Sequence, residues 1–177
     1  LAEFELVNLR DFGLGPQKSV DDTPYGGGDG MLLRCEPVFA AIESVKAKDP
    51  DAKVILPTPV GKIWDQKAAR ELPTGHYIIL CPHYEGYDER IRLGLKPREI
   101  SIGDYVITGG ELGALILIDS VSRNLKGVLG EDICSSNDSF SNGINGLLEY
   151  PQYTKPREFE GMMVPEILLS GNHEKIE

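Results

Sequence analysis

The chain has 177 residues, of which 41% are hydrophobic and 26% are charged, and 28 acidic against 18 basic residues give it a formal net charge of −10. This is the composition of a globular protein with one sizeable core, and no run approaches the roughly eighteen apolar residues that a membrane-spanning helix needs. The negative charge argues against a polyanionic partner bound through the general surface, although a local basic patch or a further basic domain would still allow one.

The cysteine and histidine pattern argues against two kinds of structural site. Cys35, Cys81 and Cys134 are odd in number and form no C-x-x-C pair, which favours a reducing cytoplasm over a disulfide framework. The three histidines show no metal-ligand spacing with these cysteines, so a structural zinc site is not expected. No basic segment followed by an apolar one opens the chain, so no secretory signal is predicted.

Strands and helices are predicted to alternate along residues 4–125. Residues 36–48 place apolar side chains at i, i+3, i+4 and i+7, which indicates an amphipathic helix, and residues 53–58, 76–81 and 101–108 are apolar runs of strand length. Further elements are expected as a strand at 4–9 and helices at 61–72, 88–93 and 111–125, with a long polar loop at 127–145.

This alternation predicts an α/β fold with a mostly parallel sheet. In open sheets of this kind, ligands bind beyond the carboxyl ends of the strands. The Gly- and Pro-containing turns after the predicted strands place such a site near residues 58–61, 82–86 and 103–110. A glycine cluster at Tyr25–Gly30 fits a plain loop or a phosphate cradle about equally, because no Gly-Lys-Ser/Thr follows it.

Seven segments together resemble one family, the bacterial tRNA (guanine-N1)-methyltransferases of the knotted SPOUT superfamily. They occur in the family's order and spacing and span nearly the whole chain. They are SVDDTPYGGGDGM (19–31), HYEGYDERI (83–91), SIGDYVITGGEL (101–112), IDSVSRNLKGVLG (118–130), NDSF (137–140), GLLEYPQYTKP (146–156) and VPEILLSGNH (164–173).

The resemblance implies a catalytic domain at residues 1–160 with a deep trefoil knot around residues 101–130, and a linker at 161–177 toward a further domain. It also implies a cytoplasmic homodimer with a shared active site, no membrane association, and tRNA as partner. The expected reaction moves a methyl group from S-adenosylmethionine to N1 of the guanosine immediately 3′ of the anticodon, position 37. The implied cofactor-binding residues are Pro59, Pro82, Gly86, Ile102, Gly103, Asp104, Tyr105, Val106, Ile107, Gly109 and Gly110.

The chemistry of this reaction asks for two protein groups. The proton on N1 must leave as the methyl group arrives, which calls for a general base, and charge that develops on O6 calls for a cation. By resemblance the base is Asp138, the cation is Arg123, and Glu85 is a third polar residue of the site. No protein-bound metal is expected for the transfer itself, although the family shows magnesium dependence.

Each candidate also has a purely structural interpretation. Arg123 could complement a helix C-terminus, Asp138 could form an N-cap or Asx turn, and Glu85 and Asp88 could be ordinary helix-start carboxylates. Asp104, inside an apolar run, is expected to be a buried carboxylate that needs a partner. Trp64, Tyr77 and the apolar residues of the predicted helices are expected in the core, and His173 is expected to be structural.

The chain departs from the family pattern at several places. Pro82 stands where the family usually has glycine, and it removes an N–H donor where cofactor contacts are expected. Asp29 and Gly113 replace prolines, and both changes loosen loops. The family's opening strand and its helical C-terminal domain are not expected within these residues. Two alternatives therefore remain: a degenerate cofactor-binding dimerisation module with little turnover, and another SPOUT methyltransferase that acts on ribose or on rRNA.

Overall fold

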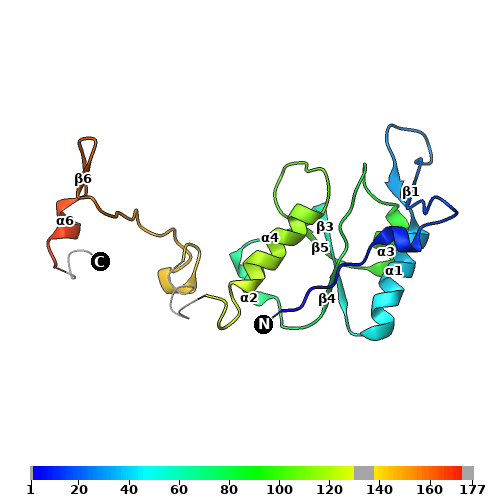
Figure 1. Cartoon of the computed structure of the whole chain (residues 1–177), viewed down its shortest axis with the longest axis horizontal. Coiled ribbons are helices and arrows are strands. Elements are labelled where there is room, and N and C mark those ends of the chain that lie inside the picture. Colours follow the sequence, from blue (N-terminus) through cyan, green and yellow to red (C-terminus); the bar gives the residue numbers. More distant parts are fainter. Residues whose placement is uncertain (1, 130–137, 173–177) are drawn as a thin grey trace. The chain divides into compact units, whose positions relative to one another are not determined.

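The computed structural model describes residues 2–129 and 138–172, and the chain divides into two compact units, Leu1–Ser135 and Ser136–Glu177 (Figure 1). Cys134, Asn137 and His173 lie outside the described residues. No helix in the described ranges combines the length and the apolar character needed to cross a membrane.

The first unit is built on a three-stranded parallel sheet. Its order is β4 (Tyr77–Ile79), β3 (Lys53–Ile63), β5 (Arg98–Ser101). β3 pairs in parallel with both neighbours, and its register against β5 shifts between Pro57 and Lys62. The sequence prediction of a parallel α/β fold is therefore confirmed for this unit.

Helices cover both faces of the sheet (Figure 1). On one face, Val54 and Leu56 of β3 pack with residues of α1 (Cys35–Lys48) and α3 (Glu89–Leu95). On the other face, Ile55 packs with Leu117 of α4 (Glu111–Ser122), and α2 (Gln66–Glu71) contacts α4. The alternation of Val54, Ile55 and Leu56 between faces follows from the period of two in a β-strand. Trp64 and Tyr77 pack against the second face, as predicted.

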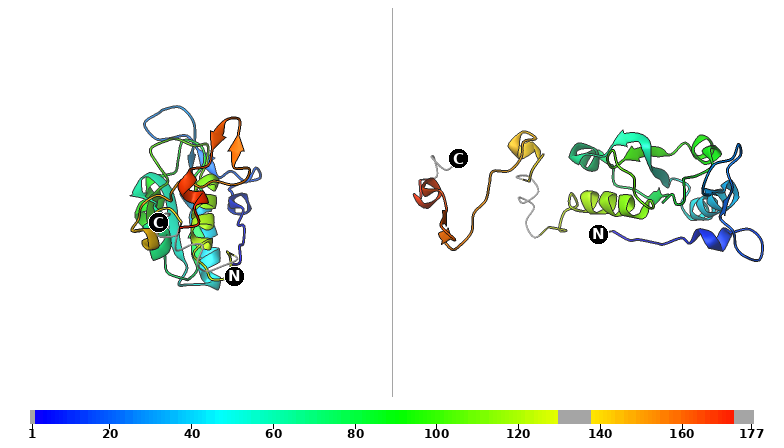
Figure 2. Two further views of the ribbon diagram at one scale, coloured as in Figure 1. Left: turned by 90° about the vertical axis from the view of Figure 1, so that its left-hand side faces the viewer. Right: turned by 90° about the horizontal axis from the view of Figure 1, so that it is seen from above.

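The amino-terminal segment differs from the predicted strand at 4–9. It runs as an extended segment outside the sheet (dark blue in Figure 2), with Leu6 98% exposed, and leads into the 3-10 helix η1 (Leu9–Phe12). A strand needs a ladder partner, and within the described residues this segment has none. η1 contacts α1 instead, and the next strands, β1 (Asp21–Asp22) and β2 (Leu32–Leu33), form an antiparallel pair.

The predicted helix at 61–72 is wrong in its first half. β3 continues to Ile63, and only Gln66–Glu71 is helical, starting from the N-cap Asp65, whose carboxylate accepts the Ala68 N–H at 2.7 Å. Pairing with β5 decides the outcome: a Cβ on Gly61 would lie 2.4 Å from the Ile100 carbonyl carbon, so only glycine lets the two backbones approach this closely.

The predicted strand at 101–108 is also wrong. β5 ends at Ser101, and the following residues form an irregular loop in which Gly103 has a φ of 142°. Tyr105 folds back over Gly103 and donates a hydrogen bond from its hydroxyl to the Ile102 carbonyl at 2.9 Å. Asp104 is consequently exposed, which corrects the expectation of a buried carboxylate.

Between residues 138 and 172, the second unit has short elements. These are η2 (Asn142–Ile144), the antiparallel pair β6 (Glu158–Phe159) and β7 (Met162–Met163), and α6 (Glu166–Leu169). Residues 138–149 are joined among themselves: Phe140 N–H donates to the Leu147 carbonyl at 2.7 Å, and Ser141 is fully buried.

Candidate functional site

Two of the three predicted ligand segments are loops that meet beyond the carboxyl ends of β4 and β5, and the third, residues 58–61, lies within β3. The Gly110 N–H donates to the Pro82 carbonyl at 2.7 Å, which joins the loop after β5 to the loop after β4. The Tyr87 hydroxyl donates to Thr58 Oγ1 at 3.3 Å, which joins the second of these segments to β3 beside Pro59. Within the first unit, Pro82 and Gly110 of the two loops are therefore in contact, whereas residues 58–61 belong to β3 at its register shift against β5 and not to a loop after it.

The loop after β5 presents its backbone to solvent. Within the described parts of the chain, no hydrogen bond engages the N–H groups of residues 104–108, and Val106 is 96% exposed. Such N–H groups can recognise the edge of a purine or a ribose hydroxyl without a charged side chain. The loop thus offers the donor set that a nucleoside-containing ligand requires.

Two consecutive glycines allow the loops to approach each other. A Cβ on Gly110 would lie 2.5 Å from Pro82 Cδ and 2.7 Å from the Cys81 Cα, which are too close for any side chain. A Cβ on Gly109 would lie 2.8 Å from His83 Nε2. Gly110 requires glycine because the backbone of the opposite loop occupies the space, whereas a side chain at 109 would displace the ends of the His83 and Glu111 side chains.

Pro82 is part of this junction through its carbonyl oxygen and its ring. Its carbonyl is already taken by the Gly110 N–H, and its ring nitrogen has no proton to donate. Pro82 therefore has neither a free backbone donor nor an unengaged carbonyl to give to a ligand.

Glu85 lies beside the glycine cluster of the β1–β2 connection. Its N–H donates to the Met31 carbonyl at 3.0 Å, and the Leu33 N–H donates to the Gly86 carbonyl at 2.9 Å. A Cβ on Gly30, which has a φ of 79°, would lie 2.3 Å from Glu85 Cγ. The Glu85 side chain therefore passes close over Gly30, where the absence of a side chain leaves room for it, and it is exposed.

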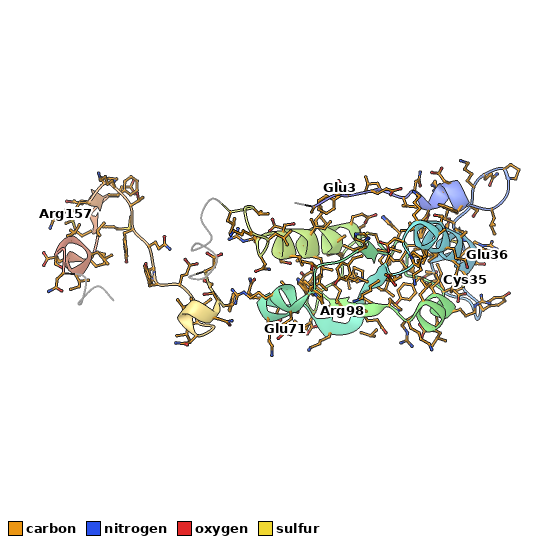
Figure 3. The ribbon with its side chains drawn as sticks, turned by 90° about the horizontal axis from the view of Figure 1, so that it is seen from below. Glu3, Cys35, Glu36, Glu71, Arg98 and Arg157 are labelled. Carbon is orange, nitrogen blue, oxygen red and sulfur yellow. The ribbon has the colours of Figure 1, made fainter. Side chains whose placement is uncertain are left out.

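Asp88, the next carboxylate, has the structural role of a helix cap. It accepts the Arg90 N–H at 2.9 Å as the N-cap of α3 and forms two side-chain bonds with the Arg90 guanidinium, at 2.9 and 2.7 Å. These bonds hold the pKa of the Asp88 carboxyl well below its usual range. Cys35 is labelled at the start of α1 in Figure 3, and burial together with the nearby Asp88 carboxylate raises the pKa of its thiol.

The two main catalytic candidates belong to different units. Arg123 is the exposed C-cap of α4 in the first unit, with its N–H donating to the Asp119 carbonyl at 3.1 Å. Asp138 lies at the start of the second unit, where its backbone carbonyl accepts the Ser141 N–H at 2.9 Å.

Two residues of the loop region were missed by sequence reasoning. His83 Nε2 lies 2.6 Å from Glu111 Oε1, so a side chain of the loop after β4 pairs with the first residue of α4. The only available signal was a carboxylate in the first turn of a predicted helix, which is too common to indicate a site.

The first unit is that of an α/β protein with a parallel sheet, and the joined loops lie at the edge of the sheet where such folds bind ligands. The sequence model of tRNA (guanine-1)-methyltransferase TrmD matches residues 1–177. A tRNA (guanine-N(1)-)-methyltransferase of Geobacillus kaustophilus is 54% identical over 98% of this chain and 70% of its own length. Proteins of the same name from Dehalococcoides mccartyi and Listeria welshimeri are 55% and 54% identical, over 100% and 99% of this chain and 71% of each relative. The chain belongs to the tRNA (guanine-1)-methyltransferase family.

Proposed function

We propose that this methyltransferase moves a methyl group from S-adenosylmethionine to N1 of the tRNA guanosine immediately 3′ of the anticodon, position 37. The observation that carries the proposal is the family match over residues 1–177, together with relatives of that named activity at 54–55% identity. These matches favour the enzyme over a degenerate binding module.

The loop region fits the methyl donor through its backbone. The unengaged N–H groups of residues 104–108 and the glycines at 109 and 110 suit the adenine edge and the ribose, and the sulfonium of the bound donor supplies an already activated methyl group. The residues proposed to line the site are Pro59, Pro82, Gly86, Ile102, Gly103, Asp104, Tyr105, Val106, Ile107, Gly109 and Gly110. We further propose that the segment around residues 101–130 threads a backbone loop as a trefoil knot.

In the proposed reaction, Asp138 accepts the proton from N1 of guanine, and the Arg123 guanidinium stabilises the charge that develops on O6. Glu85 lies at the edge of the loop region and completes the polar part of the site. Asp138 and Arg123 lie in different units, and a homodimer in which Asp138 of one protomer approaches the cofactor of its partner would bring them together.

The remaining partners follow from this substrate. A tRNA substrate places the enzyme in the cytoplasm, where tRNA is modified. In residues 2–129 and 138–172, no group of three His, Cys, Asp or Glu side chains is arranged to hold a metal ion.

A methyl-transfer assay tests the function. Unmodified tRNA with G37 should accept labelled methyl from S-adenosylmethionine, and the A37 version of the same tRNA should not. N1 methylation blocks base pairing, so reverse transcription should stop at position 37, whereas ribose methylation would give no such block. Binding of S-adenosylhomocysteine without any transfer to tRNA would instead establish the degenerate module.

A further inference from the structure

A side-chain pair spans the two loops that the proposed function assigns to the cofactor. His83 belongs to the loop after β4, and Glu111 is the first residue of α4, directly after the loop that follows β5. Their Nε2 and Oε1 atoms are 2.6 Å apart, and their side chains are 50% and 56% exposed. The pair is thus reachable from solvent and is not part of the core.

Gly109 lies directly against this pair. A Cβ built on Gly109 would come within 2.5 Å of Glu111 Oε2 and within 2.8 Å of His83 Nε2. The next residue, Gly110, makes the backbone bond to Pro82 at 2.7 Å. Two attachments, one from side chains and one from the backbone, therefore fasten the carboxyl end of the 102–110 loop to the neighbouring loop.

The negative charge of Glu111 affects the Cys81 thiol at this junction. Burial, and after it the Glu111 carboxylate, raises the pKa of the Cys81 thiol to about 11. Cys81 immediately precedes Pro82, and a Cβ on Gly110 would lie 2.7 Å from the Cys81 Cα. Glu111 also lies in the first turn of α4, where a carboxylate is favoured by the helix dipole.

We propose that His83 and Glu111 are positioning residues that hold the backbone of the 102–110 loop in the shape that binds the methyl donor. The inference rests on the proposed function and goes beyond it by assigning residues outside the cofactor list. Neither side chain transfers a proton or touches the methyl group in this role. A loop that is already ordered loses less conformational freedom when the ligand binds, which strengthens binding without a new contact.

The test compares the parent with His83→Ala, Glu111→Ala and the double variant, in the full chain. Each single variant should speed amide hydrogen exchange in residues 102–110 without ligand and weaken calorimetric binding of S-adenosylhomocysteine by about 3- to 10-fold, the effect of one lost hydrogen bond. The double variant should bind S-adenosylhomocysteine no more weakly than the weaker-binding single variant, because each single substitution already removes the same interaction. KM should rise for S-adenosylmethionine and stay unchanged for tRNA.

Matched variants separate positioning from general damage. Glu111→Gln keeps a hydrogen-bonding side chain and should restore most of the affinity. Gly109→Ala should reproduce the loss with both side chains of the pair present, because its Cβ displaces them. Glu71→Ala, at the end of α2 (labelled in Figure 3), breaks the exposed Lys67–Glu71 pair at 3.7 Å and should change neither exchange nor affinity.

Parent-like exchange and affinity in both single variants would overturn the proposal, as would strictly additive losses in the double variant. The result is distinguishable from failure of the proposed function. If the parent binds S-adenosylhomocysteine but methylates no tRNA, the affinity and exchange data still decide the role of the pair. If the parent does not bind the nucleoside at all, the role in donor binding is overturned together with the cofactor assignment.

Discussion

The Gly110 N–H donates to the Pro82 carbonyl across 2.7 Å, so a residue that departs from the family pattern is also the acceptor that joins the loops after β4 and β5. The Pro82 carbonyl accepts this hydrogen bond, and the Pro82 ring nitrogen has no N–H to donate to a ligand. The Pro82→Gly variant regains an N–H donor and keeps the carbonyl. Calorimetric affinity for S-adenosylhomocysteine should therefore increase by about 3- to 10-fold, the scale of one added hydrogen bond. An unchanged dissociation constant would show that the missing donor is irrelevant to binding.

A second prediction concerns the space between the loops. In Gly110→Ala the added Cβ would meet the backbone of Cys81 and Pro82 at 2.7 and 2.8 Å, so the loops must separate. Urea denaturation should show a loss of about 1–3 kcal/mol in the free energy of unfolding. Gly113→Ala is the control. Gly113 lies inside α4, and its added Cβ would make an ordinary van der Waals contact with Pro57 Cβ at 3.4 Å. Alanine is the better helix former, so this variant should gain up to about 1 kcal/mol; equal effects from both variants would contradict the steric argument.

A third prediction concerns acid stability. The bonds from Arg90 hold the pKa of Asp88 below its unfolded value of about 3.9, so this pair stabilises the fold above that pH. The stabilisation is lost as pH falls through the lowered folded pKa. Between pH 4 and pH 2, the free energy of unfolding should therefore fall more steeply in the parent than in Asp88→Asn, which keeps an N-cap but no charge.

Asp88→Ala loses the cap as well and should be about 1 kcal/mol less stable than Asp88→Asn at neutral pH. Parallel pH curves for the parent and Asp88→Asn would show that the carboxylate does not titrate between the folded and unfolded states as argued.

A fourth prediction concerns assembly. Leu112, Leu115 and Ile116 of α4 are 58%, 59% and 43% exposed, although the apolar pattern of this helix predicted core positions. An isologous dimer that covers this face would explain the pattern. Light scattering at micromolar concentration should give the mass of two chains, and Leu115→Glu should shift it toward one. A monodisperse monomer in the parent would contradict the shared active site.

The elements with a clear period were predictable from the sequence. The helix at 36–48 follows from its apolar spacing, and β3 and β4 follow from short apolar runs. The irregular backbone at 102–108 was predicted as a strand because its run of apolar residues is typical of one. Its actual path depends on the positive φ of Gly103 and on the fold-back of Tyr105. The sequence pattern of an apolar helix face is the same whether the core or another protomer covers it. Leu112 and Leu115 were therefore predicted in the core although they are exposed in the single chain.

The candidate site was predictable in outline only. The positions of the ligand loops follow from strand order, because parallel strands bring their carboxyl ends to one edge. The roles of Asp138 and Arg123 come from the family resemblance, since a carboxylate in a polar loop and an arginine at a helix end are equally common as structural residues. The contacts of Gly110 with Pro82 and of His83 with Glu111 depend on three-dimensional approach and leave no pattern in the sequence.

The identity of the proton acceptor is the central claim of the proposed chemistry, and a single-turnover measurement tests it most directly. Asp138→Asn keeps the size of the side chain and its hydrogen bonding but cannot take the proton from N1 of guanine. With G37-containing tRNA and saturating S-adenosylmethionine, the rate of methyl transfer should fall by about 10²-fold or more, the scale of a lost general base, while affinity for S-adenosylhomocysteine is unchanged. A rate within a few-fold of the parent would contradict the account and remove Asp138 from the catalytic role.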